Sequence, residues 1–328
     1  MAMVRSDLVK NNVNKRGFRY IFGPAPSRRL GVSLGLDLVP PKTCTLDCLY
    51  CEVGRTTVKT VERFDHAMAG DLLEELERYL NSSCPELDYI TLAGSGEPTL
   101  NKEIGRIIQG IKEMTPVKVA VLTNGSLLDR KEVRSDLARA DLVIPSLDAA
   151  RVETFRQLNR PHQALDLGKI INGLIEFRRE FQGRFWLEIL LVKGFNNHEE
   201  ELAALKEAAV RIRPDRMQVN TVFRPPAEAV AQPISREALE RVTQFFGPAA
   251  EAVNEFQKTP LKIERAEAEN EILNLVGRRP CSAEDLSLVL ALPSSQVWDI
   301  LTELLDSGAI LQEKHADHIF FRRVQSAD

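Results

Sequence analysis

From residue 33 onwards, short runs of apolar and β-branched residues alternate with longer amphipathic stretches. In those stretches the apolar residues recur every three or four positions, which is typical of helices that pack one face on a sheet. The runs that predict strands are 33–39, 89–94, 117–124, 141–147, 185–192 and 216–223. The stretches that predict helices between them are 69–83, 101–114, 130–140, 164–180 and 198–212. This alternation indicates right-handed βαβ units and a parallel sheet. Because a closed TIM barrel needs eight such units, the pattern predicts an α/β fold with a partial, open (β/α)6 TIM-like barrel.

The pattern changes towards the C-terminus. A further helix is expected over 235–246, where Ser235 precedes an apolar series. Beyond it, three short helices and a two-stranded ribbon with a turn near 315–317 favour a small winged helix-turn-helix domain. The expected organisation is therefore an N-terminal arm over 1–32, a barrel over 33–246, a linker over 247–268 and a winged-helix domain over 269–328.

Composition and charge limit the kinds of molecule that the chain is expected to bind. Hydrophobic residues make up 44% of the 328 positions and the formal net charge is −4, so the chain has no overall basic footprint for nucleic acid. Within 269–328 acidic residues outnumber basic ones, and the helix from Ser294 to Asp306 has no Lys or Arg. Since phosphate neutralisation drives most nucleic-acid affinity, we expect this domain to contact a protein or peptide rather than duplex DNA.

The chain also lacks the usual marks of membrane insertion and secretion. No apolar run approaches the roughly 18–20 residues of a membrane span, and the polar N-terminus has no secretory signal. We therefore expect a cytoplasmic protein in a reducing compartment, where disulfides are uncommon.

Three of the five cysteines lie close together. Cys44, Cys48 and Cys51 form a C-x3-C-x2-C run just after the first predicted strand. Three thiolates on one short loop can ligate three irons of a [4Fe–4S] cluster and leave the fourth iron open to another ligand. The alternative of a structural zinc site needs a fourth ligand, and no His or Cys lies at the usual spacing.

This cysteine spacing, with the aromatic Tyr50 just before the last cysteine, resembles the radical SAM superfamily. The resemblance implies that a reduced [4Fe–4S] cluster splits S-adenosylmethionine and yields a 5′-deoxyadenosyl radical, which abstracts hydrogen from a substrate. It also implies an electron donor such as flavodoxin or ferredoxin. The substrate is left open between an RNA base, a peptide and a small metabolite.

Later segments resemble further motifs of that superfamily. Residues 94–98, Gly-Ser-Gly-Glu-Pro, resemble its Gly-Gly-Glu-Pro segment, which implies that the backbone and the acid receive the methionine amino group. Residues 145–149 resemble its Ser-x-Asp segment, whose polar groups face the methionine carboxylate and ribose. The implied cofactor-binding residues are Tyr50, Gly94, Gly96, Glu97, Asn124, Ser146, Asp148, Glu188, Lys193 and Asn220; no catalytic residue is assigned. For Asn124 an ordinary Asn-Gly turn is the favoured alternative, whereas Glu188 and Lys193 can equally be rim charges. Their positions together support the resemblance. The candidate residues recur at the C-terminal ends of successive predicted strands, where such barrels place their active sites.

Several segments show a narrower resemblance. Residues 22–31, 33–35, 41–44 and 158–161 resemble a little-characterised group of radical SAM proteins that is related by sequence to the wyosine-forming tRNA enzymes. The chain lacks the second set of cluster-binding cysteines that the wyosine enzymes carry. Arg28 and Arg29 are either a clamp for a substrate phosphate or carboxylate, or a salt-bridged entry to the barrel. The alternative function is an iron–sulfur redox sensor with the winged helix as its output.

Overall fold

The computed structural model describes residues 18–27, 29–82, 86–253, 265–315 and 318–324. Its main sheet has eight strands in the order β1-β2-β5-β6-β7-β8-β9-β10, and every neighbouring pair is parallel except β1 and β2. The six predicted strands correspond to β2 (Gly31–Asp37), β5 (Tyr89–Ala93), β6 (Lys118–Thr123), β7 (Leu142–Pro145), β8 (Arg184–Leu191) and β9 (Arg216–Thr221). The predicted mixed α/β fold with a parallel sheet is therefore confirmed.

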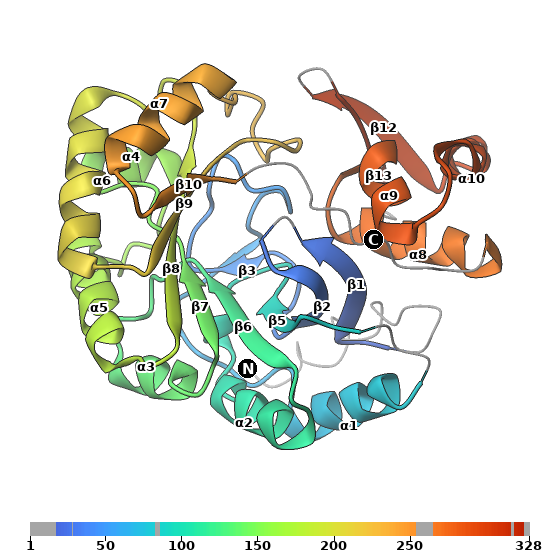
Figure 1. Ribbon diagram of the computed structural model, residues 1–328, viewed down its shortest axis with the longest axis horizontal. Helices are drawn as coiled ribbons and strands as arrows, with labels where there is room; N and C mark the ends of the chain where they lie inside the picture. Colours follow the sequence, from blue (N-terminus) through green and yellow to red (C-terminus); the bar gives the residue numbers. More distant parts are fainter. Residues whose placement is uncertain (1–17, 28, 83–85, 254–264, 316–317, 325–328) are drawn as a thin grey trace.

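Helices cover the outer face of this curved sheet (Figure 1). They are α1 (Ala69–Leu80), α2 (Ile104–Met114), α3 (Lys131–Leu137), α4 (Val152–Leu158), α5 (Leu167–Glu180), α6 (Glu199–Ile212) and α7 (Arg236–Phe246). In α2 the residues Ile104, Ile107, Ile108 and Ile111 are fully buried, which is the one-face spacing that the sequence showed. Their burial against the sheet removes apolar surface from water, and each such side chain contributes about 1.5–3 kcal/mol.

Two edge strands were not predicted. Strand β1 (Ile21–Ser27) pairs antiparallel with β2, so the expectation of an arm over 1–32 is wrong for residues 21–27. Prolines at 24 and 26 hid this strand, because proline cannot donate to a ladder and is tolerated on edge strands. Strand β10 (Ala250–Ala252) pairs parallel with β9, so the expected linker over 247–268 begins with a strand. Residues 254–264 of that linker lie outside the described residues.

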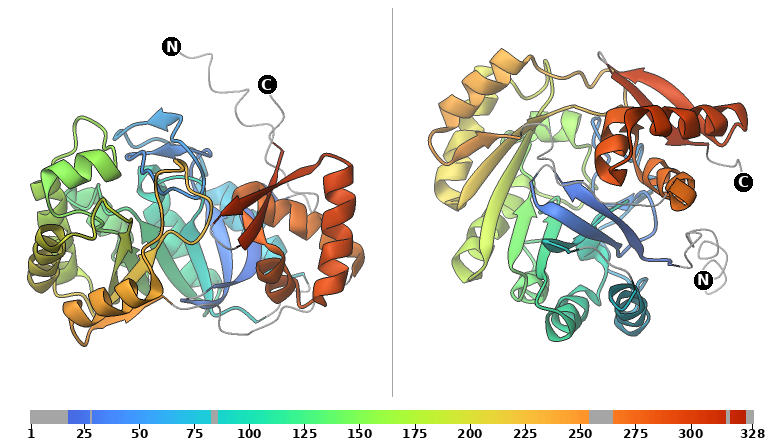
Figure 2. Two further views of the ribbon diagram at one scale, coloured as in Figure 1. Left: turned by 90° about the horizontal axis from the view of Figure 1, so that it is seen from above. Right: turned by 45° about the vertical axis from the view of Figure 1, so that its right-hand side comes forward.

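The C-terminal segment from 265 to 324, with the gap at 316–317, has its own apolar core. Its elements are α8 (Arg265–Arg278), β11 (Cys281–Ser282), α9 (Ala283–Leu290), α10 (Ser294–Asp306), β12 (Ile310–His315) and β13 (His318–Arg323). The strands form an antiparallel sheet in the order β11-β13-β12, so β11 adds a strand to the predicted ribbon. Figures 1 and 2 show this segment beside the β1–β2 end of the main sheet. The winged-helix assignment stays a prediction.

No single helix among the described residues is long and apolar enough to cross a membrane. The bent pair Ala283–Leu290 and Ser294–Asp306 meets the requirement only when joined, by length and composition alone.

Candidate functional site

The cysteine motif lies on a loop that begins in the short strand β3 (Thr43–Cys44), which pairs with β4 (Val58–Lys59). Backbone hydrogen bonds fix the loop between the end of β5 and the end of α4. They join Glu97 N to Thr43 O (3.1 Å), Asp47 N to Asn159 O (3.0 Å) and Leu49 N to Leu158 O (3.0 Å). A turn within the loop joins Cys51 N to Cys48 O at 3.3 Å. The three cysteines are therefore held by tertiary contacts from two distant segments.

The two glycines of the Gly-Ser-Gly-Glu-Pro segment allow this close packing. Gly94 has a φ of +124°, and a Cβ there would collide with the Asp37 carboxylate. A Cβ at Gly96 would collide with the Thr43 carbonyl at the start of the cysteine loop. The structure therefore places both glycines against neighbouring protein, whereas the resemblance implied close approach to a cofactor.

The donor set of the loop fits an iron–sulfur cluster. Burial raises the pKa of the Cys44 thiol to about 12 and also raises the pKa values of Cys48 and Cys51. Metal ligation needs thiolates, so cluster binding must release these protons. Among the described residues no group of three or more His, Cys, Asp or Glu has the geometry for a single metal ion. A [4Fe–4S] cubane differs, because it separates its thiolates by its own width, and three sulfurs on one loop suit it.

Two asparagine side chains contact the cysteine sulfurs. Asn124, just after β6, places Nδ2 3.4 Å from Cys44 Sγ and 2.8 Å from Thr45 Oγ1. Asn159, just after α4, places Nδ2 3.3 Å from Cys48 Sγ. Asn159 was not predicted as a site residue, although the Leu158-Asn159-Arg160-Pro161 segment was the signal that pointed to it.

Asp148 joins the cysteine loop to β8. Its carboxylate accepts hydrogen bonds from the Tyr50 hydroxyl and, at 2.8 Å, from Leu190 N. Burial raises the pKa of Asp148 to about 6. Burial also raises the pKa of Tyr50, and the neighbouring Asp148 charge adds to that shift. The structure thus brings together two of the predicted cofactor-binding residues at the back of the loop.

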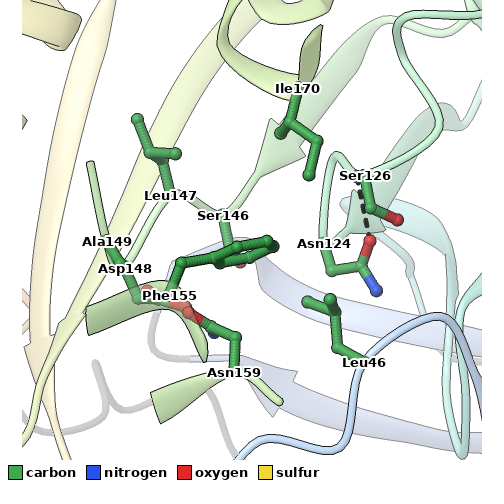
Figure 3. Close-up of a pocket in the computed structure, with 10 residues that line it drawn as sticks. All are labelled: Leu46, Asn124, Ser126, Ser146, Leu147, Asp148, Ala149, Phe155, Asn159 and Ile170. Carbon is green, nitrogen blue, oxygen red and sulfur yellow. Dashed lines mark hydrogen bonds between the residues drawn. The ribbon is translucent and has the colours of Figure 1, made fainter. Parts of the chain in front are cut away.

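A small cavity lies beside Asp148 (Figure 3). Asn124, Ser146, Asp148 and Asn159 are among its lining residues, and its volume is ≈ 20 Å³. That volume is enough for about one water molecule and far too small for S-adenosylmethionine.

A larger cavity of ≈ 340 Å³ lies between the interior of the main sheet and the C-terminal segment. Cys51, Tyr50, Glu188 and Asn220 all line it. Small-molecule sites commonly have about 300–1,000 Å³, so this cavity has the size of a ligand site. Its position brings the third cysteine together with predicted residues from β8 and β9.

Glu188 contacts two other polar residues that line the larger cavity. Its Oε1 lies 2.9 Å from Arg29 Nη1 and 3.4 Å from Asn220 Nδ2. Of the two interpretations of Arg29, the structure therefore shows a salt bridge, and this pair ties the β1–β2 turn to β8. Arg28 lies outside the described residues.

Gly94 and Gly96 line neither cavity, and the same holds for two further predicted cofactor-binding residues, Glu97 and Lys193. The fully buried carboxylate of Glu97 accepts hydrogen bonds from Thr99 N (3.1 Å), Thr99 Oγ1 (2.6 Å), Thr123 Oγ1 (2.6 Å) and Asn124 N (2.7 Å). Burial raises the pKa of Glu97, and these hydrogen bonds oppose that shift. The carboxylate thus ties the end of β5 to the end of β6 rather than facing a cavity. Lys193 is exposed and lines neither cavity.

The C-terminal segment contributes to the wall of the larger cavity through Arg279. Arg224, after β9, is 3% exposed and lies 3.2 Å from both the Glu52 and the Asp285 carboxylates. Next to it, the Phe223 ring contacts the Phe320 ring at a centroid distance of 6.0 Å. The residue after Cys51 is therefore linked through Arg224 to the start of α9.

Comparison with known proteins supports the resemblance to the radical SAM superfamily. Residues 38–205 match the Radical SAM superfamily. The chain is 30% identical over 314 residues to a UPF0026 protein of Methanocaldococcus jannaschii, covering 94% of this chain and 97% of that protein. It is also similar in structure to a radical SAM methyltransferase from Sphaerobacter thermophilus, with a TM-score of 0.52, 18% identity, and coverage of 67% of this chain and 65% of that one.

Another relative has a different name. The chain is 37% identical over 297 residues to a protein of Brachyspira hyodysenteriae named GTPase Obg; the match covers 89% of this chain but spans only 43% of that protein. The present sequence contains no G-x-x-x-x-G-K-[S/T] phosphate-binding motif. The matches to the superfamily and to the UPF0026 protein, together with the cysteine loop, lead to one conclusion: the chain belongs to the UPF0026 family of the radical SAM superfamily and is a radical SAM enzyme that uses a [4Fe–4S] cluster and S-adenosylmethionine.

Proposed function

We propose that Cys44, Cys48 and Cys51 hold the [4Fe–4S] cluster and that S-adenosylmethionine binds beside it in the larger cavity. The observation that carries this proposal is the cavity itself, because Cys51 shares its wall with Glu188 and Asn220. When bound, the reduced cluster supplies the electron that splits S-adenosylmethionine and produces the 5′-deoxyadenosyl radical, which abstracts hydrogen from the substrate.

The protein residues position the cofactor and keep water away. Glu188 and Asn220 present a carboxylate and an amide to the cavity, which suits the hydroxyl groups of a ribose. Asp148 holds the Tyr50 hydroxyl and so orients the ring next to Cys51. Arg279 of the C-terminal segment forms part of the cavity wall, which helps to limit solvent access to the radical.

The size of the cavity supports a small substrate. A folded macromolecule cannot enter a volume of ≈ 340 Å³, so only a metabolite, one side chain or one extruded base can approach the cofactor. The relation to wyosine-forming tRNA enzymes stays a prediction, and so does an electron donor of the flavodoxin or ferredoxin type in the cytoplasm.

We also propose that residues 33–246 act as a partial barrel and that the C-terminal segment is a winged-helix domain that closes it. The Phe223–Phe320 contact supports this role, since it joins a residue of β13 to a residue that lies just after β9 of the main sheet. A redox sensor with output through this segment is not favoured, because the matches are to radical SAM proteins.

The experiment that tests the proposal is electron paramagnetic resonance of the anaerobically reconstituted, dithionite-reduced protein. We expect a [4Fe–4S] signal that changes when S-adenosylmethionine is added. Cys44→Ala, Cys48→Ala and Cys51→Ala should each abolish it, whereas Cys281→Ala, at a buried cysteine of the C-terminal segment, should not. A [4Fe–4S] signal that does not change when S-adenosylmethionine is added, or that persists in the three cysteine variants, would contradict the proposal.

A further inference from the structure

Asn124 and Asn159 come from different elements but contact the cysteine loop in the same way. Asn124 follows β6 and lies 3.4 Å from Cys44 Sγ, whereas Asn159 follows α4 and lies 3.3 Å from Cys48 Sγ. Both Nδ2–Sγ distances are typical of a hydrogen bond to sulfur. The two side chains therefore place one amide donor on each of two cysteines.

The neighbours of each asparagine fix which end of the amide faces sulfur. Asn124 Oδ1 accepts a hydrogen bond from Ser126 N at 3.0 Å, and a backbone N–H can only donate. Asn124 Nδ2 must then face Cys44. For Asn159, the Asp148 carboxylate lies 3.3 Å from Nδ2, and an ionised carboxylate can only accept. Each orientation thus follows from a partner with a single possible role.

Hydrogen bonds to the sulfurs of an iron–sulfur centre set its reduction potential. Reduction adds negative charge to the cluster and its thiolates, so a donated N–H stabilises the reduced state more than the oxidised one. Backbone amides also act to lower the thiol pKa values, those of Thr45 and Leu46 at Cys44 and those of Val53 and Gly54 at Cys51. The asparagine donors differ from these because substitution can remove them.

We propose that Asn124 and Asn159 are positioning residues that raise the reduction potential of the cluster by donating N–H···S hydrogen bonds to Cys44 and Cys48. This inference rests on the proposed function, because it takes these cysteines as the cluster ligands. Asn159 is 2% exposed, so its amide acts away from bulk water, where a hydrogen bond is electrostatically stronger. The pair therefore makes the cluster easier to reduce before the radical step.

The test is a redox titration of reconstituted wild type, Asn124→Ala, Asn159→Ala and the double variant, followed by absorbance and electron paramagnetic resonance. We expect each single variant to titrate at a more negative potential. For the double variant we expect a roughly tenfold lower ratio of reduced to oxidised cluster at a given potential, which is about 59 mV for one electron. Asn196→Ala is the matched control, since Asn196 is also buried but donates to the carbonyls of Asp148 and Leu190.

The shape-conserving variants Asn124→Asp and Asn159→Asp separate the hydrogen bond from packing and charge. A negative shift in the Ala and the Asp variants, at unchanged iron content, supports the inference. Wild-type potentials in the Ala variants, or a shift confined to the Asp variants, overturn it and leave the proposed function intact. A wild-type protein that takes up no cluster instead rejects the proposed function.

Discussion

The Arg224 guanidinium lies 3.2 Å from the Asp285 carboxylate, and this ion pair connects the end of β9 to the start of α9. Both side chains are buried, at 3% and 7% exposure. The same guanidinium reaches Glu52, the residue that follows Cys51. One arginine thus couples the C-terminal segment to the cysteine loop.

Arg224→Met should lower the free energy of unfolding by about 3–5 kcal/mol, because it leaves the buried Asp285 carboxylate unpaired. Urea denaturation of the reconstituted protein measures this. The control is Arg236→Ala, which removes the exposed pair with Glu240 and should change stability by less than about 0.5 kcal/mol. If the two substitutions lowered the free energy of unfolding equally, the Arg224–Asp285 pair would not stabilise the contact between the C-terminal segment and the cysteine loop.

Glu188→Gln should weaken S-adenosylmethionine binding about tenfold, or about 1.4 kcal/mol, if its carboxylate receives ribose hydroxyls. Calorimetric titration of the cluster-loaded protein gives the dissociation constant. Glu251→Gln serves as the matched control, because Glu251 is a partly exposed glutamate that pairs with Arg216 and does not line the cavity. An unchanged affinity in Glu188→Gln would remove Glu188 from the cofactor site.

Gly96→Ala should displace the cysteine loop, because the added Cβ meets the Thr43 carbonyl and backbone cannot move aside cheaply. We expect a loss of about 1–3 kcal/mol of stability, as in other overpacked sites, and reduced iron content after reconstitution. Gly70→Ala in α1 is the control, since nothing lies within 4 Å of its added Cβ. If Gly96→Ala took up iron as the wild type does, the loop would not need this glycine.

Acid should destabilise the protein partly through His66. Its pKa is lowered to about 4, first by burial and second by the charge of Arg19. The unfolded chain protonates this histidine near its ordinary pKa of 6.5, whereas the folded chain does not. Stability should therefore fall as the pH drops from about 6.5 to about 4. Denaturation of wild type and His66→Gln between pH 7 and pH 4.5 should show a smaller loss in the variant, and parallel curves would exclude this contribution.

The elements that could be predicted from the sequence are those with a regular spacing of apolar residues. The isoleucines of α2 and the buried runs of the parallel strands repeat at the spacing of their elements, so the six central strands were predicted. Strand β1 carries prolines and β10 has three residues, so neither shows a periodic pattern. Their pairing depends on neighbouring strands rather than on their own residues.

The site was predicted only where its residues lie in recognisable motifs. The cysteine spacing identified the loop, but the contact between Asn159 and Cys48 depends on how the C-terminal end of α4 packs against the loop. For Glu97, the motif implied a contact with the methionine amino group of the cofactor. Its four hydrogen bonds instead depend on the meeting of β5 and β6.

The most direct measurement of the central claim is the formation of 5′-deoxyadenosine from S-adenosylmethionine by the anaerobically reconstituted, dithionite-reduced protein. The account predicts that the wild type and Cys281→Ala produce it, and that Cys48→Ala loses both the cluster absorbance and the product. Absence of 5′-deoxyadenosine from cluster-loaded wild type, or its continued formation by Cys48→Ala, would contradict the account.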